Sequence, residues 1–231
     1  MANNTEMNHK AERIALTRAI EHEASETAAW TGRTTFNARV IRAIAEVPRH
    51  LFIPGAPPPG VAYANRPQPI GLGQTISQPY IVALMTELLD LDGGEKVLEV
   101  GTGSGYQTAV LAEIAGEVYS VERFADLAAG ARATLAECGY SNIHMSCSDG
   151  TRGWVEHAPY DAIMVTAAAD GPVPQALIEQ LQPGGRMVIP LGPRHGPQML
   201  TVGLKDQTGR FTKHPVLPVS FVPLVSLGKE G

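Results

Sequence analysis

The sequence has few of the features that bind nucleic acid or metals. Of its 231 residues, 18 are Lys or Arg and 23 are Asp or Glu, so the formal net charge is −5, and the basic residues form no cluster. This balance argues against nonspecific binding to nucleic acid. The two cysteines, Cys138 and Cys147, lack metal-binding or redox spacing. We therefore expect free thiols in a reducing compartment and no metal site.

Long apolar runs are also lacking. No stretch approaches the ~18 residues of a membrane span, and Met1–Lys10 is polar with no apolar signal core. Hydrophobic residues nevertheless make up 44% of the chain and charged residues 18%, which is typical of a globular domain. We expect a cytoplasmic monomer that binds neither nucleic acid nor membrane.

Residues 97–105 are the most informative stretch of the chain. Apolar residues at its start favour a strand covered on both faces. Glycine then occupies every second position: Gly101, Gly103 and Gly105. Such a turn brings the backbone close to a ligand, and the helix that follows directs its N-terminal amides at it. The alternative is a glycine turn that only connects a strand to a helix.

Glu99 precedes the first glycine by two residues and bears on the choice of ligand. It would repel the pyrophosphate of a dinucleotide, and Tyr106 breaks the dinucleotide glycine spacing. A nicotinamide oxidoreductase is therefore disfavoured. A ligand with an ammonium group and no phosphate fits better, and S-adenosylmethionine is such a ligand.

Two further acids follow predicted strands. Glu122 ends the segment 117–122, about 20 residues past the glycine turn, where a doubly wound sheet places the acid that binds ribose hydroxyls. A solvent-exposed glutamate at a strand end is the alternative. Asp149 and Gly150 follow the third strand, and Asp149 is a candidate acceptor for an adenine amino group. Asp-Gly is also simply a good turn.

Strands and helices alternate from residue 96 to residue 191, which predicts an α/β fold. We expect a doubly wound, mostly parallel, Rossmann-like sheet with helices on both faces. Strands are predicted at 96–100, 117–122, 142–147, 160–166 and 186–191, and helices at 105–115, 124–138 and 174–181. Residues 199–205 and 211–216 flank a polar turn and predict an antiparallel hairpin.

Two helices are predicted before the proline-rich segment, and a third, which begins at Pro79, follows it. A weakly amphipathic surface helix over residues 8–29 follows a loose tail, and Asn37 caps a second helix that ends at Pro48. We therefore divide the chain into a partly helical N-terminal extension, 1–36, and a main domain, 37–231, that contains the sheet. Prolines between 49 and 74 predict an irregular loop, which either covers a site or tethers the N-terminal helices.

From about Val47 to Leu224 the chain resembles the protein-L-isoaspartate O-methyltransferases. The glycine stretch is shared by many methyltransferases, whereas residues 74–80, Gln-Thr-Ile-Ser-Gln-Pro-Tyr, are specific to this family. The other segments that carry the resemblance are 47–54, 69–71, 149–150, 158–163, 181–186 and 221–224.

The resemblance implies transfer of a methyl group from S-adenosylmethionine to the free α-carboxylate of L-isoaspartyl residues in damaged peptides and proteins. It makes Ser77 the active-site serine that holds this carboxylate, and Val222 a backbone contact to the peptide. It also assigns a wall of the cofactor site to Gln74, Thr75 and Ile76. Ser77 would otherwise cap the helix that begins at Pro79. A carboxylate, with a reference pKa near ~4, is already a nucleophile at neutral pH and needs no general base.

The chain departs from the family pattern in two places. About the first 35 residues exceed the usual bacterial length, and nothing in them predicts a function. The loop 55–60 is rich in proline, and Asn65 stands where relatives often have Asp. These departures bear on peptide preference more than on the reaction, and they leave open a methyltransferase of the same fold that acts on another peptide carboxylate. A non-catalytic module that binds S-adenosylmethionine is a separate alternative, and the presence of Ser77 counts against it.

Overall fold

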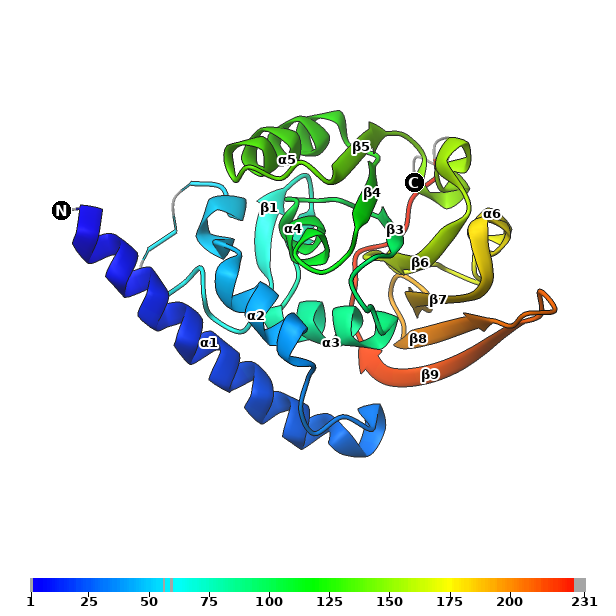
Figure 1. Cartoon of the computed structure of the whole chain (residues 1–231), viewed down its shortest axis with the longest axis horizontal. Helices are drawn as coiled ribbons and strands as arrows, with labels where there is room; N and C mark the ends of the chain where they lie inside the picture. Colours follow the sequence, from blue (N-terminus) through cyan, green and yellow to red (C-terminus); the bar gives the residue numbers. More distant parts are fainter. Residues whose placement is uncertain (1, 56, 59, 227–231) are drawn as a thin grey trace.

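A seven-stranded sheet forms the centre of the computed structural model, which describes residues 2–55, 57–58 and 60–226 (Figure 1). The strand order is β5-β4-β3-β6-β7-β8-β9. The strands are β3 (Lys96–Val100), β4 (Glu117–Glu122), β5 (Ile143–Cys147), β6 (Tyr160–Val165), β7 (Leu181–Leu191), β8 (Gln198–Lys205) and β9 (Phe211–Val219).

The sheet is parallel from β5 to β7, and β8 and β9 add an antiparallel hairpin at its edge. The chain moves outward from β3 to β5 and then returns to β6 on the other side of β3. The strand order therefore reverses between β3 and β6, and doubly wound sheets bind their ligands at such a point. The predicted fold class and the hairpin are confirmed.

Helices cover both faces of the sheet. On one face lie α3 (Pro79–Leu89), α4 (Tyr106–Ala112) and α5 (Ala125–Glu137), and on the other lies α6 (Gln175–Gln180). Val97 packs in the buried cluster of the first face, and its neighbours Leu98 and Val100 in that of the second. This alternation along β3 is the two-residue period of a strand. Within the described part of the chain, no helix combines the length and the hydropathy that spanning a bilayer requires.

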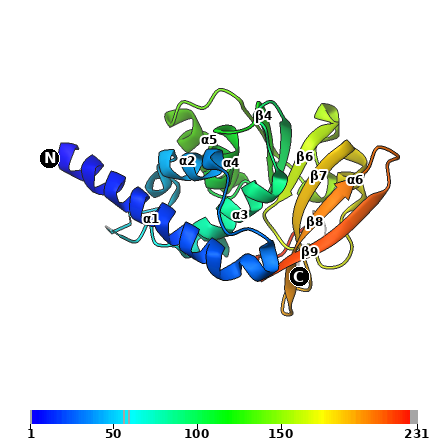
Figure 2. The ribbon, with the colours of Figure 1, turned by 60° about the horizontal axis from the view of Figure 1, so that its bottom comes forward.

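The N-terminal helix α1 (Ala2–Thr31) is longer and better packed than predicted. The loose tail expected before residue 8 is wrong over residues 2–8, which belong to α1, while residue 1 lies outside the described residues. One side of α1 buries Leu16, Ile20 and Ala24, which recur at one-turn spacing. The helix contacts α2 (Ala38–Glu46), α3 and β9, and Figure 2 shows its C-terminal end beside β9. Residues of α1 are therefore part of the main core.

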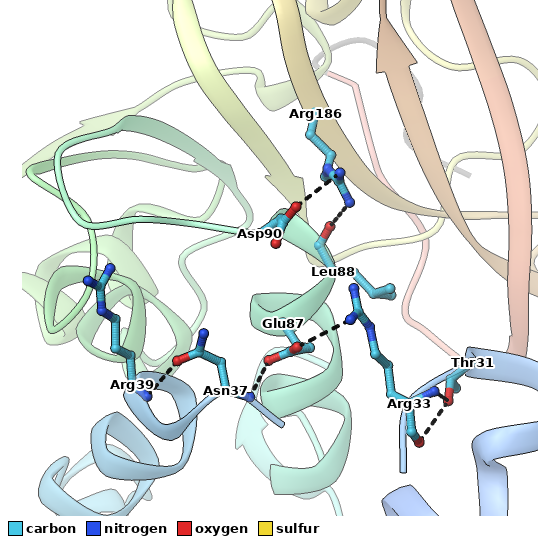
Figure 3. A network of polar contacts seen from close by, with 8 residues as sticks. All are labelled: Thr31, Arg33, Asn37, Arg39, Glu87, Leu88, Asp90 and Arg186. Atoms are coloured by element: carbon cyan, nitrogen blue, oxygen red, sulfur yellow. Dashed lines mark hydrogen bonds and ion pairs between the residues drawn. The ribbon is translucent and has the colours of Figure 1, made fainter. Parts of the chain in front are cut away.

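Polar contacts fix α3 between the N-terminal helices and the sheet (Figure 3). Asn37 caps α2 as predicted, and its backbone N donates to Glu87 Oε2 at 2.7 Å. Arg33, from the segment after α1, lies 3.8 Å from the Glu87 carboxylate. At the end of α3, Asp90 forms an ion pair of 3.2 Å with Arg186 of β7. These contacts hold the C-terminal end of α3. Ser77 lies just before the N-terminal end of the same helix.

The segment 49–74 is more regular than predicted. It contains a 3-10 helix, η1 (Arg49–Phe52), and β1 (Gln68–Gly71), which pairs with β2 (Gln74–Ile76) in an antiparallel hairpin. The prediction that prolines exclude regular structure here is wrong. Pro69 lies inside β1 opposite Thr75. A two-stranded hairpin has only edge strands, and an edge strand tolerates proline because its missing N–H can face away from the partner.

Candidate active site

The glycine turn connects β3 to α4 at the point where the strand order reverses. The φ angles of its glycines are all positive, at 99° for Gly101, 54° for Gly103 and 89° for Gly105. A Cβ on Gly101 would lie 2.4 Å from Thr166 Oγ1, and one on Gly105 would lie 3.2 Å from Leu135 Cδ1. Both the backbone conformation and the close packing therefore require glycine at these positions.

Glu122 ends β4 and fixes the glycine turn. Its Oε2 accepts a hydrogen bond from Gly103 N at 2.7 Å, and its Oε1 accepts one from Phe124 N at 2.9 Å. Only 5% of its surface is exposed, so a solvent-exposed strand-end glutamate is excluded. A carboxylate has about four lone-pair sites, so two of them stay available for a ligand.

Glu99 lies beneath the glycine turn rather than in the open. It is fully buried, and its Oε2 accepts hydrogen bonds from Thr108 Oγ1 and Ser120 Oγ, each at 2.5 Å. Its Oε1 has no hydrogen-bond partner among the described residues. Burial raises the pKa of the Glu99 carboxyl to about 8, although the two hydroxyl donors favour the charged form. Its predicted contact with a cofactor stays a prediction.

A cleft opens beside the turn at the carboxyl ends of β3, β4 and β6. Its wall combines the glycine turn with Glu122, Phe124 and Gly150, and the C-terminal segment 222–225 faces them. Gly150 approaches β3 so closely that a Cβ would lie 2.5 Å from Val100 Cγ1. Among the described residues, the cleft is thus lined by one acid, Glu122, and one base, Arg123, together with neutral polar and apolar residues.

Asp149 caps a turn at the edge of this cleft. Its Oδ1 accepts hydrogen bonds from Thr151 N at 3.0 Å and from Thr151 Oγ1 at 2.7 Å, at the start of η2 (Gly150–Arg152). The Asp149 side chain is 6% exposed and does not line the cleft, whereas Gly150 does. The turn is thus confirmed, and the contact with adenine stays a prediction.

A second cavity, with a volume of about 550 Å³, adjoins the cleft. Thr75, Thr166 and Val222 line both spaces and form a shared wall. Ser77 lines the larger cavity. The structure therefore brings the predicted catalytic serine and the glycine turn to two sides of one wall.

Ser77 is held by its backbone and does not cap α3. The N-cap residue of α3 is Gln78, and Pro79 is the first residue of the helix, so the capping alternative is excluded. The buried Arg49 donates from Nη2 to the Ser77 carbonyl at 2.9 Å and from Nε to the Ala62 carbonyl at 3.0 Å. Arg49 thereby positions Ser77 without using the serine hydroxyl.

The remaining predicted residues differ in their surroundings. Gln74 and Thr75 line the cleft, whereas Ile76 is 3% exposed and lines neither the cleft nor the cavity. The Val222 carbonyl accepts a hydrogen bond from Ala168 N at 2.8 Å, which ties the C-terminal segment to the loop after β6. The roles of these residues toward ligands stay predictions.

Sequence reasoning missed three residues around Ser77. Glu23 and Thr27 reach the cavity from α1, and Thr27 Oγ1 hydrogen-bonds the Tyr80 hydroxyl of α3. They follow the buried Ile20 and Ala24 by three residues each, so they lie on the side of the helix that faces the core. This spacing is the one feature of the sequence that could have indicated their position. Arg49 lies in the segment 47–54 that carries the family resemblance, but its contact with Ser77 was not predicted.

Comparison with known proteins points to one family. The family model described as protein-L-isoaspartate(D-aspartate) O-methyltransferase matches residues 29–229. Protein-L-isoaspartate O-methyltransferase 2 of Syntrophobacter fumaroxidans is 51% identical over 214 residues, which cover 93% of this chain and 86% of the relative. A protein-L-isoaspartate O-methyltransferase of Anaeromyxobacter dehalogenans is 54% identical over 206 residues, which cover 88% of this chain and 98% of the relative.

Solved structures agree with this match. One structure, described as protein-L-isoaspartate O-methyltransferase, is 27% identical with a TM-score of 0.79, and the match covers 91% of this chain and 65% of that chain. A second, from Plasmodium falciparum and described as a complex with S-adenosyl-L-homocysteine, is 23% identical with a TM-score of 0.74. That match covers 94% of this chain and 98% of the other, and at this identity it shows the shared fold.

Proposed function

The chain belongs to the protein-L-isoaspartate(D-aspartate) O-methyltransferase family, and we propose that it repairs damaged proteins by methylating the free α-carboxylate of L-isoaspartyl residues. The observation that carries this proposal is the wall shared by the cavity at Ser77 and the cleft at the glycine turn. Because the two spaces adjoin at the residues that line both of them, a carboxylate oxygen held in the cavity can reach a methyl carbon held in the cleft, and the bond to oxygen forms as the bond to the departing sulfur breaks.

The residues around the glycine turn fit S-adenosylmethionine. Glu122 keeps lone pairs for ribose hydroxyls, and Val121 and Phe124 offer apolar surface for an adenine ring. Oε1 of the buried Glu99 lies beneath the same turn without a partner among the described residues, so it is available to accept a hydrogen bond from an ammonium group. A bound ammonium group would favour the ionised form of Glu99, whose pKa burial raises to about 8 in the cofactor-free protein. The cofactor, when bound, supplies an electrophilic methyl group on a sulfonium centre.

The protein's own residues orient the acceptor. The Ser77 hydroxyl can donate a hydrogen bond to the substrate carboxylate, while Arg49 holds the Ser77 carbonyl at 2.9 Å. The acceptor is already ionised at neutral pH, with a reference pKa near ~4. No proton has to be removed from it, and the described residues that line the cavity include no His or Lys to remove one. Orientation of the two reactants then provides much of the rate enhancement.

We further propose that the enzyme acts as a cytoplasmic monomer whose partners are isoaspartyl peptides and proteins, with no nucleic acid or membrane partner. The free thiols of Cys138 and Cys147 support a reducing compartment. The net charge of −5 supports the exclusion of nucleic acid. The division into an extension of residues 1–36 and a methyltransferase domain of residues 37–231 stays a prediction.

Transfer of a radiolabelled methyl group to two matched peptides tests the proposed function. The peptides carry the same sequence, one with L-isoaspartate and one with normal L-aspartate. We expect label in the isoaspartyl peptide alone. Equal labelling of both peptides would indicate another carboxylate as substrate, and cofactor binding without transfer would indicate a non-catalytic module.

A further inference from the structure

Glu23 brings a negative charge to the wall of the cavity that holds Ser77. It lies on α1, is half-buried, and is the only ionisable acid or base that lines this cavity among the described residues, apart from the Tyr80 phenol. The family model begins at residue 29 and does not include Glu23, whereas the 93% of this chain that aligns with the Syntrophobacter fumaroxidans relative does include it. The role of this carboxylate is therefore argued from its contacts.

Neutral amides hold the Glu23 carboxylate in place. Oε2 accepts a hydrogen bond from Asn65 Nδ2 at 2.7 Å, and Gln78 Nε2 lies 3.1 Å from Oε1 and 3.0 Å from Oε2. No ion pair of Glu23 occurs among the described residues. Burial raises the pKa of Glu23, and the two amides oppose this shift because they favour the charged form. The charge is thus positioned, and no cation neutralises it.

The Asn65 side chain can donate a hydrogen bond to a carboxylate at position 23. Its side-chain amide nitrogen donates to Glu23, and its Oδ1 accepts a hydrogen bond from Tyr80 N at 2.9 Å. An aspartate at position 65 would still accept from Tyr80 but would face Glu23 with a second carboxylate. The amide at position 65 therefore allows Glu23 to keep its charge at the cavity wall.

We propose that Glu23 is a subsite for a cationic group of the substrate, so that the enzyme prefers isoaspartyl peptides with Lys or Arg near the damaged residue. This inference rests on the proposed function. The substrate α-carboxylate lies at Ser77, and a basic side chain of the same peptide reaches Glu23 across the cavity of about 550 Å³. An acidic side chain in that place is repelled.

The competing interpretation gives Glu23 a purely structural role, as the acceptor that holds Asn65 and Gln78. The two interpretations differ in what removal of the charge does. A structural role predicts that every peptide loses rate to the same extent. A cation subsite predicts that the loss depends on the charge of the peptide.

A peptide series separates these interpretations. Each set contains three isoaspartyl peptides that differ only in whether one flanking position carries Lys, Met or Glu, and kcat/KM is measured for each peptide. Further sets place the varied residue at other positions before and after the isoaspartate. We expect the Lys peptide to exceed the Met peptide by about 5-fold at the responsive position, and the Glu peptide to fall below it. In Glu23→Gln the ratio of Lys to Met falls to about 1, and in Glu23→Lys the Glu peptide becomes preferred.

Glu21→Gln is the matched control, since Glu21 lies on α1 two residues from Glu23 but is exposed and outside the cavity. It should keep the wild-type ratio. The inference is overturned if the wild-type enzyme shows no preference at any position, or if Glu23→Gln lowers all rates and keeps the ratio. Failure of the wild-type enzyme to methylate any isoaspartyl peptide would instead overturn the proposed function, and the subsite with it.

Discussion

Glu122 Oε2 accepts a hydrogen bond from the backbone N of Gly103 at 2.7 Å. The acid that ends β4 therefore fixes the turn that ends β3. Its other oxygen holds Phe124 N at 2.9 Å, on the wall of the same cleft. One carboxylate thus shapes the cleft beside the glycine turn and is part of its wall.

Glu122→Gln should weaken cofactor binding. The substitution keeps the size of the side chain, removes its charge and places an amide nitrogen against a backbone donor. Hydrogen bonds to charged groups contribute about 1.5–3 kcal/mol, so we expect affinity for S-adenosylhomocysteine to fall roughly 10- to 100-fold. Calorimetry measures this. Glu117→Gln, at the other end of β4, is the control and should bind as the wild type does; unchanged affinity in Glu122→Gln refutes the ribose role.

Ser77→Ala should lower turnover and leave cofactor affinity unchanged. The hydroxyl would donate to a carboxylate, and loss of such a bond costs roughly 10- to 100-fold in kcat/KM. Steady-state kinetics with an isoaspartyl peptide and calorimetry with S-adenosylhomocysteine separate the two effects. Ser220→Ala removes another hydroxyl from the same cavity and should change the rate little. A parallel loss of cofactor affinity in Ser77→Ala would mean that Ser77 belongs to the cofactor cleft.

Glu99 should make the cofactor-free protein less stable as the pH rises. Its folded pKa of about 8 lies above the unfolded value, so its contribution is fully present below the unfolded pKa and is lost as the pH approaches and passes about 8. A pKa difference of one between the folded and unfolded states corresponds to about 1.4 kcal/mol, which makes the loss a few kcal/mol. Urea unfolding from about pH 5 to pH 8 should show a shallower dependence for Glu99→Gln. Parallel profiles for the two proteins would show that Glu99 is ionised in the fold.

Ile20→Ala should destabilise the whole protein, because Ile20 is fully buried between α1 and the rest of the core. Removal of a buried Ile side chain costs about 2–5 kcal/mol. Ile14→Ala on the same helix, where the side chain is 46% exposed, should cost less than about 0.5 kcal/mol. Urea unfolding compares the two variants. Equal, small effects would show that α1 is dispensable for folding.

The parallel sheet could be predicted because its strands carry strong local signals. The bounds of β3 and β4 coincide with the prediction, since apolar runs end at a glycine turn in one case and at Glu122 in the other. The predicted helix 124–138 and strand 142–147 agree with α5, whose C-cap is Cys138, and with β5, which ends at Cys147. The position of the glycine turn could also be predicted from local signals, because its backbone conformation requires the glycines themselves.

Features that depend on distant partners could not be predicted. The spacing of Leu16, Ile20 and Ala24 shows which side of α1 is apolar but not which element covers it, so the approach of Glu23 to Ser77 was missed. Glu99 is next to the turn in sequence, yet the alternation of β3 directs its carboxylate toward Thr108 of α4. Pro69 favours a loop because proline is unfavourable inside a sheet. Its position in β1 depends on pairing with β2, and no pattern in the sequence predicts β2 as a strand.

The central claim is that the cofactor and the substrate carboxylate meet where the cleft and the cavity adjoin, at Thr75, Thr166 and Val222. A crystal structure with S-adenosylhomocysteine and an isoaspartyl peptide tests this most directly. We expect the ribose at Glu122, the cofactor sulfur facing the shared wall, and the peptide α-carboxylate at Ser77. A nucleoside bound away from the glycine turn, or a peptide carboxylate out of reach of Ser77, would contradict it.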